Sequence, residues 1–403
     1  MREIRRIQDV DVAGKRVLVR VDFNVPMKDG KVSDATRLVS AIPTIELLTG
    51  KGARVILIAH FGRPKGQHVP EMSLEPVAQP LADLLGVPVD FCMETVGEEA
   101  MAAAADMADG DVLLLENTRF HPGEEANDPA LARQLADLAD LYVNDAFSAA
   151  HRAHTSTEGV AQLLPSYAGL AMQREIDHLV AALEAPQRPV IALVGGAKVS
   201  TKLDLLNNLV KKVDILFVGG GMANTLLNAQ GVKVGKSLCE KDLVDTARAI
   251  IATAEETGCK LMLPSDVVVA KEFRPNPETR LTAVTDVAED EMILDCGPAT
   301  VVALAMAMED AKTLIWNGPL GAFETPPFET ATVAAAQQAA RAVKERGLVA
   351  VAGGGDTVAA LNQAGVSNDF SFISTAGGAF LEWMEGKALP GVGVLKQARG
   401  VAA

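Results

Sequence analysis

Short apolar runs alternate with longer amphipathic segments along the whole chain. The runs in the first half are "RVLVRVDF", "RVILIAH", "DVLLLEN" and "LYVNDAF", and those in the second half are "PVIALVGG", "DILFVGG", "LVAVAGGGD" and "FISTAGG". Continuous apolar runs are typical of strands that are buried on both faces of a parallel sheet. The alternation of such strands with helical segments predicts an α/β protein built from open, doubly wound parallel sheets.

The helical segments carry start and stop signals. In "DPALARQLADLADL", Asp128 is a candidate N-cap and Pro129 fits the first turn. "LVSAIPTIELLTGKG" ends in Gly50 and Gly52, as helix C-termini often do. The segment 183–190, "LEAPQRPV", has two prolines between a helical run and a new strand, and it is the best candidate for a domain boundary. All six histidines precede this segment and both tryptophans follow it, so we expect two domains with different ligands.

The composition limits the possible partners. With 403 residues, 49% of them hydrophobic, the chain is long enough for two ordinary domains. A net charge of -15 disfavours nucleic acid or an anionic membrane as the main partner. The N-terminal "MREIRRIQDV" has no apolar core behind its charges, so we expect no signal peptide and a cytoplasmic location. The cysteines are far apart and form no CxxC pair, so we expect buried, reduced thiols at Cys92, Cys239, Cys259 and Cys296.

Polar residues stand where the first strand-like run ends. Asp22 and Asn24 follow this run, and Pro26 prevents the strand from continuing. Ligands of open parallel sheets bind beyond the carboxyl ends of the strands, where an acceptor and an amide could hold a hydroxyl-bearing ligand. An Asx turn after an edge strand explains the same residues, and this stretch alone leaves both interpretations open.

Basic side chains follow the other strands of the first half, and Arg37 stands at the start of an expected helix. Arginines that converge on one sheet edge would form an oxyanion receptor, because the planar guanidinium binds phosphate or carboxylate with two hydrogen bonds. Surface ion pairs are the alternative for any single arginine. His151 and His154 lack a third ligand at matching spacing, so we expect no metal there. The candidate receptor residues are His60, Arg63, Arg119, His151, Arg152 and His154.

The glycine clusters of the second half fit neither common nucleotide motif. "GVKVGKS" has three residues between its glycines where a P-loop has four, and "GGGMANT" and "GGGDTVAA" lack the GxGxxG spacing. Three segments nevertheless read as strand, glycines and helix start, a pattern that favours oxyanion binding. We expect Lys198 and Lys202, four residues apart, to share one helical face, and Asp356 suits a shared Mg²⁺. Tight packing remains the alternative for each glycine turn taken singly.

Together these segments resemble the phosphoglycerate kinase family. The matching motifs are "RVDFNVP", "HFGRP", "LENTRF", "NDAFSAAHRAH", "GGAKVSTK", "VGGGMANT", "WNGPLGAFE", "GGGDT" and "STAGGAFLE", and they span nearly the whole chain in family order. The resemblance implies two Rossmann-like domains joined by a hinge helix. Residues 1–170 would bind 3-phosphoglycerate, with segment 389–403 packing back on them; residues 171–186 would form the hinge helix, and 187–388 would bind Mg-ADP or Mg-ATP. It also implies a monomer without nucleic-acid or membrane partners.

The resemblance also implies a role for individual residues. Substrate would be bound by Asp22, Phe23, Asn24, Arg37, His60, Phe61, Gly62, Arg63, Arg119 and Arg152. Catalysis would involve Arg37, Lys198, Lys202, Gly354 and Gly377. Nucleotide would be bound by Gly195, Lys202, Gly219, Gly220, Asn317, Glu324, Gly353, Gly354, Gly355, Asp356 and Thr357, with Asp356 as the magnesium ligand.

The implied reaction is reversible phosphoryl transfer between 1,3-bisphosphoglycerate and ADP, a step of glycolysis and gluconeogenesis. Its acceptor in the ATP-consuming direction is a carboxylate, which is ionised at neutral pH because its pKa is about 4, so no general base is required. One position departs from the family: Ala376 in "STAGG" stands where the commonest motif has glycine, and a positive φ there would make alanine costly. A dehydrogenase and a non-catalytic nucleotide-binding protein are the rival readings, and the missing GxGxxG argues against the first.

Overall fold

Two six-stranded sheets, each in its own unit of the chain, form the frame of this computed structural model. The structure describes residues 4–396. The chain divides between Asp177 and His178 and again between Lys387 and Ala388, so that the segment from Ala388 onward returns to the first unit. Residues 1–3 and 397–403, which belong to the predicted first domain and its C-terminal segment, lie outside the described residues.

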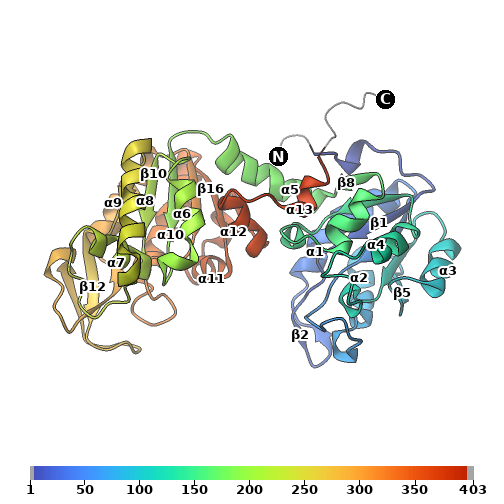
Figure 1. Ribbon diagram of the computed structural model, residues 1–403, viewed down its shortest axis with the longest axis horizontal. Coiled ribbons are helices and arrows are strands. Elements are labelled where there is room, and N and C mark those ends of the chain that lie inside the picture. The colour runs from blue at the N-terminus through green and yellow to red at the C-terminus, as the bar shows by residue number, and fades with distance from the viewer. Residues whose placement is uncertain (1–3, 397–403) are drawn as a thin grey trace. The chain divides into compact units, whose positions relative to one another are not determined.

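The first unit, which runs from blue to green in Figure 1 apart from its C-terminal segment, has a wholly parallel main sheet. Its strand order is β5-β6-β4-β1-β7-β8. Its strands are β1 (Arg16–Arg20), β4 (Arg54–Ile58), β5 (Asp90–Cys92), β6 (Val112–Leu115), β7 (Leu141–Asn144) and β8 (Ser166–Ala168). A small antiparallel hairpin, β2 (Met27–Lys28) with β3 (Lys31–Val32), follows β1. The helices are α1 (Thr36–Gly50), α2 (Glu75–Leu85), α3 (Glu98–Asp106), α4 (Pro129–Ala136) and α13 (Pro390–Gly393).

Alternate residues of each strand serve opposite faces of this sheet. Val17 and Val19 of β1 pack in a core with α1 and α2. Leu18, between them, packs in a second core with α3 and α4. Successive side chains of a strand point to opposite faces, so a continuous apolar run supplies both cores at once. The sheet is therefore doubly wound, as the sequence predicts.

The second unit repeats this plan in the order β11-β10-β9-β15-β16-β17, again wholly parallel. Its strands are β9 (Val190–Val194), β10 (Ile215–Val218), β11 (Lys260–Met262), β15 (Thr313–Asn317), β16 (Val349–Gly353) and β17 (Phe372–Ser374). A three-stranded antiparallel sheet is added, consisting of β12 (Asp266–Ala270), β13 (Thr279–Ala283) and β14 (Met292–Cys296). The helices are α6 (Leu203–Leu209), α7 (Gly220–Ala229), α8 (Val244–Thr257), α9 (Pro298–Asp310), α10 (Thr330–Arg346), α11 (Gly355–Gln363) and α12 (Gly378–Met384).

Helix α5 (Leu170–Leu179) carries the chain out of the first unit and continues as a π-helical turn at Val180–Glu184. Its start is anchored by Asp145, which follows β7. The Asp145 Oδ1 atom accepts hydrogen bonds from the backbone N–H groups of Ala171 (2.8 Å) and Met172 (3.2 Å). A carboxylate satisfies the unpaired N–H groups at a helix start. Burial opposes this charge and raises the pKa of Asp145 to about 7.

The fold class predicted from the sequence, two parallel-sheet α/β domains, is confirmed. The helix signals also hold: Asp128 Oδ1 caps α4 by accepting from Ala130 N (2.8 Å) and Leu131 N (2.9 Å), and α1 ends at Gly50. The short strands β5, β8 and β11 and the antiparallel sheet were not predicted. The four cysteines are free thiols, and all but the half-buried Cys239 are buried. No helix within residues 4–396 is long and apolar enough to span a membrane.

Candidate active site

Strand β1 ends at the point where the strand order of the first sheet reverses, between β1 and β7. Asp22 lies just beyond it. Its carboxylate accepts hydrogen bonds from Arg37 Nη1 at 2.8 and 2.7 Å and from Ser148 Oγ at 2.5 Å. The backbone N–H of Asn24 also donates to Asp22 Oδ1 (3.2 Å). Asp22 therefore forms the Asx turn and, in addition, orients Arg37 in the first turn of α1.

The loop after β4 is held against this edge through its backbone. Gly62 donates its N–H to Asn24 Oδ1 (3.0 Å), and its carbonyl accepts from Arg119 Nη1 (2.8 Å). Arg119 itself is only 7% exposed and pairs with Glu125 at 3.2 Å. Asn24 and Arg119, which follow different strands, thus bind the two backbone groups of one residue, Gly62.

Two of the predicted substrate-binding residues have side chains in the core. Phe23 lies in the loop after β1, and Phe61 lies in the loop after β4. Phe23 is fully buried and Phe61 is 9% exposed. The backbone of Phe61 is bracketed by Asn117, which accepts from its N–H (3.0 Å) and donates to its carbonyl (2.7 Å). Phe23 and Phe61 can therefore reach a ligand only through backbone atoms. Asn117 was missed in the sequence, although it stands at a strand end within "LENTRF".

The basic side chains gather around two histidines. Burial and the charges of Arg20, Arg119 and Arg37, together with that of His154, lower the pKa of His60 well below its ordinary value. Burial and Arg119, Arg20 and Arg152 lower the pKa of His154 to about 4. These mutual effects show that the arginines and histidines share one region, as an oxyanion receptor requires.

Two other predicted members of the receptor differ in their surroundings. Arg152 donates from Nε to His151 Nε2 (3.0 Å). Arg63 is exposed and makes no hydrogen bond or ion pair within residues 4–396. The charges of Arg37, Arg119 and Arg152 therefore act in one region. Arg63 stays a predicted member of the receptor, exposed and without a partner of its own in this part of the chain.

A fully buried polar network that was not predicted lies behind this edge. Arg20 is 1% exposed and donates from Nε to Ser156 Oγ (2.9 Å) and from Nη2 to His60 Nδ1 (2.8 Å). Ser156 Oγ in turn donates to Glu124, which is also fully buried. The signal for this network was a charged residue inside an apolar strand, because arginine is buried only when its charge is compensated.

In the second unit the strand order reverses between β9 and β15. The loops after these strands touch: Gly195 donates its N–H to Asn317 O (3.0 Å). A Cβ atom on Gly195 would lie 1.7 Å from the carbonyl oxygen of Pro319, so only glycine permits this approach. Open α/β sheets bind ligands at such reversal points.

Lys202 connects these two loops. Its ammonium donates to Gly195 O (2.6 Å) and to Asn317 Oδ1 (2.6 Å), and Asn317 Nδ2 donates onward to Gly353 O (2.8 Å). Burial lowers the pKa of Lys202 to about 8, against the attraction of Asp356. Lys202 is thus a partly buried cation that binds at the ends of β9 and β15 and is linked through Asn317 to the end of β16.

The expectation that Lys198 and Lys202 share a helical face is wrong. Residues Val199–Thr201 form a 3-10 turn, and α6 begins only at Leu203, so both lysines lie ahead of the helix. Ser200 within this turn donates from N (2.9 Å) and Oγ (2.5 Å) to the carboxylate of Glu240, which holds the segment outside the helix. Lys198 is exposed, whereas Lys202 is half-buried.

The third glycine loop leads from β16 into α11. Gly354 has φ +98°, a left-handed value that favours glycine, and Asp356 stands in the first turn of α11. Thr357 Oγ1 donates to Gly353 O (2.8 Å) and accepts from Gly318 N (2.7 Å), which joins this loop to the one after β15. The Thr357 hydroxyl therefore already has structural partners.

Asp356 fits the requirements of a magnesium ligand. Its carboxylate is exposed and makes no hydrogen bond or ion pair within residues 4–396. Mg²⁺ prefers oxygen ligands and is usually held by one or two carboxylates together with substrate phosphates and water. Among the described residues no group of three or more histidine, cysteine or acidic side chains could form a metal cage, and this ion does not need one.

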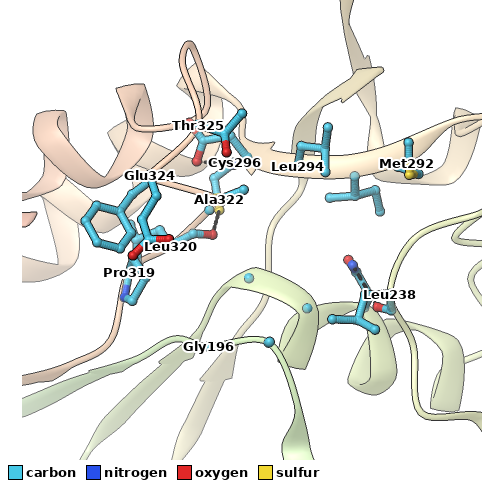
Figure 2. A pocket seen from close by; sticks show the side chains of 18 of the residues that line it. Gly196, Leu238, Met292, Leu294, Cys296, Pro319, Leu320, Ala322, Glu324 and Thr325 are labelled. Carbon is cyan, nitrogen blue, oxygen red and sulfur yellow. Dashed lines mark hydrogen bonds between the residues drawn. The ribbon is translucent and has the colours of Figure 1, made fainter. Parts of the chain in front are cut away.

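A largely apolar pocket of about 430 Å³ opens beside the glycine loops. Figure 2 shows it between Gly196, the β14 side chains Met292 and Leu294, and the segment from Pro319 to Thr325. Glu324 lies in that segment and is exposed, and Asp356 also lines the pocket. Gly219 and Gly220, where α7 begins, complete the set of predicted glycines, and Gly220 is also part of the pocket wall.

Comparison with known proteins identifies this arrangement. Residues 7–387 match the family model described as phosphoglycerate kinase. A phosphoglycerate kinase of Maricaulis maris is 77% identical over 392 residues, which cover 97% of each chain. Two solved structures are also similar. That of phosphoglycerate kinase from Coxiella burnetii has a TM-score of 0.92 at 42% identity and covers 97% of this chain and 98% of its own. That of the enzyme from Pyrococcus horikoshii has a TM-score of 0.79 at 30% identity, with the same coverage.

The chain belongs to the phosphoglycerate kinase family. The predictions from sequence that the chain belongs to this family and is a kinase are confirmed. At Ala376, where the chain departs from the family motif, the backbone does not adopt a positive φ. The left-handed residue of this loop is Gly377, with φ +53°. The cost foreseen for alanine at position 376 therefore does not arise from backbone strain.

Lys202 should make the stability of the second unit depend on pH. Its pKa is about 8 in the folded protein and about 10.5 when unfolded, so between these values only the unfolded chain holds the proton. Stability should therefore rise as pH increases from about 8 to about 10.5, where the buried ammonium is relieved of its charge. Urea unfolding of the second unit across this range should show the rise, and Lys202→Met should abolish it. A rise of equal size in the variant would contradict the assignment.

Proposed function

We propose that this enzyme catalyses reversible, Mg²⁺-dependent transfer of a phosphoryl group from 1,3-bisphosphoglycerate to ADP, giving 3-phosphoglycerate and ATP. The observation that carries the proposal is the chemical contrast between two sheet edges. One edge gathers arginines and histidines, while the other combines glycine loops, a partly buried lysine, a free carboxylate and an apolar pocket. Such a pair suits an anionic acid on one unit and a nucleotide on the other.

The proposed glycerate site uses the carboxyl edge of the first sheet. Arg119, Arg152 and Arg63 bind the phosphate and carboxylate oxygens, with His60 and the backbone of Phe61 and Gly62 nearby. Asp22 and Asn24 hold the glycerate hydroxyl, with the backbone of Phe23 between them. The guanidinium groups suit this task because their planar donors match two oxygens of one oxyanion.

The proposed nucleotide site uses the second sheet. The apolar pocket of about 430 Å³ accepts the adenine ring, and Glu324 accepts hydrogen bonds from the ribose hydroxyls. The phosphates lie along the glycine loops beside Lys202 and Asn317, where backbone N–H groups and helix starts favour negative charge. Asp356 holds magnesium, which when bound neutralises phosphate charge.

Transfer proceeds in line and without a general base, because the accepting carboxylate is already ionised. Catalysis then consists of positioning and charge neutralisation in a loose transition state. Arg37 supplies positive charge from the first unit, and Lys198 and Lys202 supply it from the second. Backbone groups of Gly354 and Gly377, at the starts of α11 and α12, add donors.

The reacting groups belong to two units, so we propose that the units close on each other around a hinge helix, residues 171–186, in each cycle. The domains are 1–170 with 389–403 and 187–388. Closure excludes water, which would otherwise hydrolyse the acyl phosphate. The enzyme acts as a cytoplasmic monomer in glycolysis and gluconeogenesis, without a nucleic-acid or membrane partner.

The direct test is a coupled assay. ATP and 3-phosphoglycerate are supplied with Mg²⁺, and the acyl phosphate formed is reduced by glyceraldehyde-3-phosphate dehydrogenase with oxidation of NADH. Turnover should require both substrates and should stop when Mg²⁺ is chelated. Binding of ATP without any turnover would reject the kinase in favour of a nucleotide-binding protein.

Arg37→Ala should lower kcat by about a hundredfold or more, because the loss of one preorganised donor to the transition state typically costs this much. The affinity for Mg-ATP, measured by calorimetry, should stay unchanged. Arg54→Ala is the matched control, since Arg54 begins strand β4 at the opposite edge and pairs with Asp109 on the surface. An unchanged kcat in Arg37→Ala would remove Arg37 from the mechanism.

Asp356→Ala should weaken Mg-ATP binding at least about tenfold, because even changes next to a metal's direct ligands cost about 10- to 100-fold in affinity. Binding of 3-phosphoglycerate should be unaffected. Asp310→Ala, which alters an exposed carboxylate at the end of α9, serves as the control. Equal loss of Mg-ATP and of magnesium-free ATP binding would show that Asp356 does not act through the metal.

A further inference from the structure

Arg20 lies behind the basic edge and is too deeply buried to bind a ligand itself. It is the last residue of β1 and is 1% exposed. All three nitrogens of its guanidinium have partners. Nε donates to Ser156 Oγ (2.9 Å), Nη1 donates to the carbonyl of Val21, and Nη2 faces His60 Nδ1 at 2.8 Å.

The direction of each hydrogen bond in this network is fixed by what its members can donate. Ser156 Oγ donates its single proton to Glu124, so it meets Arg20 with a lone pair. Glu124 is fully buried and also accepts from Ser156 N (2.9 Å) and Thr118 Oγ1 (3.3 Å). The Glu124 carboxylate thus compensates the buried charge of Arg20 through one serine hydroxyl.

A guanidinium has donors and no acceptor. At 2.8 Å from Arg20 Nη2, His60 Nδ1 must therefore be the acceptor and carry no proton. A neutral imidazole then has its proton on Nε2. Within residues 4–396 this Nε2 has no hydrogen-bond partner, and His60 is partly exposed. The free N–H is available to a ligand.

The charges that face His60 act in the same direction. They are Arg20 on β1, Arg37 on α1, Arg119 in the turn after β6 and His154 in the segment after β7. No carboxylate is among the groups that influence it most strongly. A second proton on the His60 ring would point an N–H at the N–H of Arg20, so the hydrogen bond would be lost. It would also add a positive charge next to several others. Both the hydrogen-bond geometry and the electrostatic repulsion therefore disfavour the imidazolium form of His60.

We propose that Arg20 is a positioning residue that fixes His60 as a neutral imidazole with its proton on Nε2, so that His60 donates one hydrogen bond to a substrate oxyanion and takes no part in proton transfer. The ligand is the phosphate or carboxylate of the phosphorylated acid, so the proposal rests on the proposed function. A neutral N–H donor can orient the substrate oxyanion without adding to the repulsion among the arginine charges. It also keeps this contact independent of pH.

The first test uses the unaltered enzyme with ¹⁵N-labelled histidine. Long-range ¹H–¹⁵N spectra distinguish a protonated from an unprotonated ring nitrogen, and the His60 signals are assigned by their loss in His60→Gln. We expect unprotonated Nδ1 and protonated Nε2 between about pH 5 and pH 8, the range in which histidine ordinarily changes charge. The opposite tautomer, or formation of imidazolium within this range, would overturn the proposal whether or not the enzyme turns over 3-phosphoglycerate.

The second test compares His60→Gln with His60→Ala. Glutamine can place an N–H near the position of Nε2 but cannot act as an acid or base, so it should raise the KM for 3-phosphoglycerate less than alanine does and should leave the shape of the pH profile unchanged. Alanine should raise that KM by about tenfold to a hundredfold, as expected for a lost hydrogen bond to an anion, with kcat and the KM for ATP nearly unchanged. A limb of the pH profile that disappears in His60→Gln would show that His60 transfers a proton and would refute the proposal.

Arg20→Lys tests the positioning role itself, because lysine keeps the charge and loses the planar fork. We expect a mixture of His60 tautomers in the spectra and a raised KM for 3-phosphoglycerate at nearly constant kcat. A folded variant with an unchanged tautomer and KM would refute the role of Arg20. If the buried substitution unfolds the protein, the ¹⁵N spectra of the unaltered enzyme still determine which tautomer His60 adopts. Absence of turnover in the unaltered enzyme, with the expected tautomer present, would reject the proposed function and not the tautomer.

Discussion

The site depends on one constraint: within each six-stranded sheet every neighbouring pair of strands is parallel. Residues far apart in sequence, such as Asp22 and Ser148, therefore meet wherever strands end on the same edge. In the second unit the same geometry brings Gly195 against Pro319 and joins Lys202 to Asn317. A single antiparallel strand in the centre of either sheet would send its chemistry to the opposite edge.

The same constraint explains what could be predicted from sequence. The strands, the glycine loops and Arg37 at a helix start are local patterns, and parallel topology then assigns them to one edge. Asn117 also follows a strand and could have been found this way. Ser156 and Glu124 could not, because their role comes from partners far along the chain: Ser156 meets Arg20 across 136 positions. The prediction for Lys198 and Lys202 was wrong because residues four apart share a helical face only within a helix. Helix α6 begins at Leu203, after both lysines.

Burial divides the basic groups into those that keep their charge and those that do not. Desolvation lowers the pKa of Arg119, but a guanidinium starts so far above neutrality that it remains charged. The same environment keeps His154 neutral at pH 7, because it lowers the pKa of this histidine to about 4. Lys202, with a pKa of about 8, lies between these limits. The arginines of the first edge therefore keep their charge across neutral pH, whereas Lys202 of the second edge loses its proton only slightly above neutral pH.

This division suits a reaction that moves no proton. An ionised carboxylate needs neither an acid nor a base, so a titrating histidine beside it would add a pH dependence without helping the transfer. Arginines provide the charge, and neutral histidines provide directed N–H donors among them. The buried chain from Glu124 through Ser156 and Arg20 to His60 fits this scheme. It places a carboxylate behind the Arg20 charge and keeps Nδ1 of His60 as an acceptor. In the proposed site, the N–H on Nε2 is then the one His60 group left for a substrate oxygen.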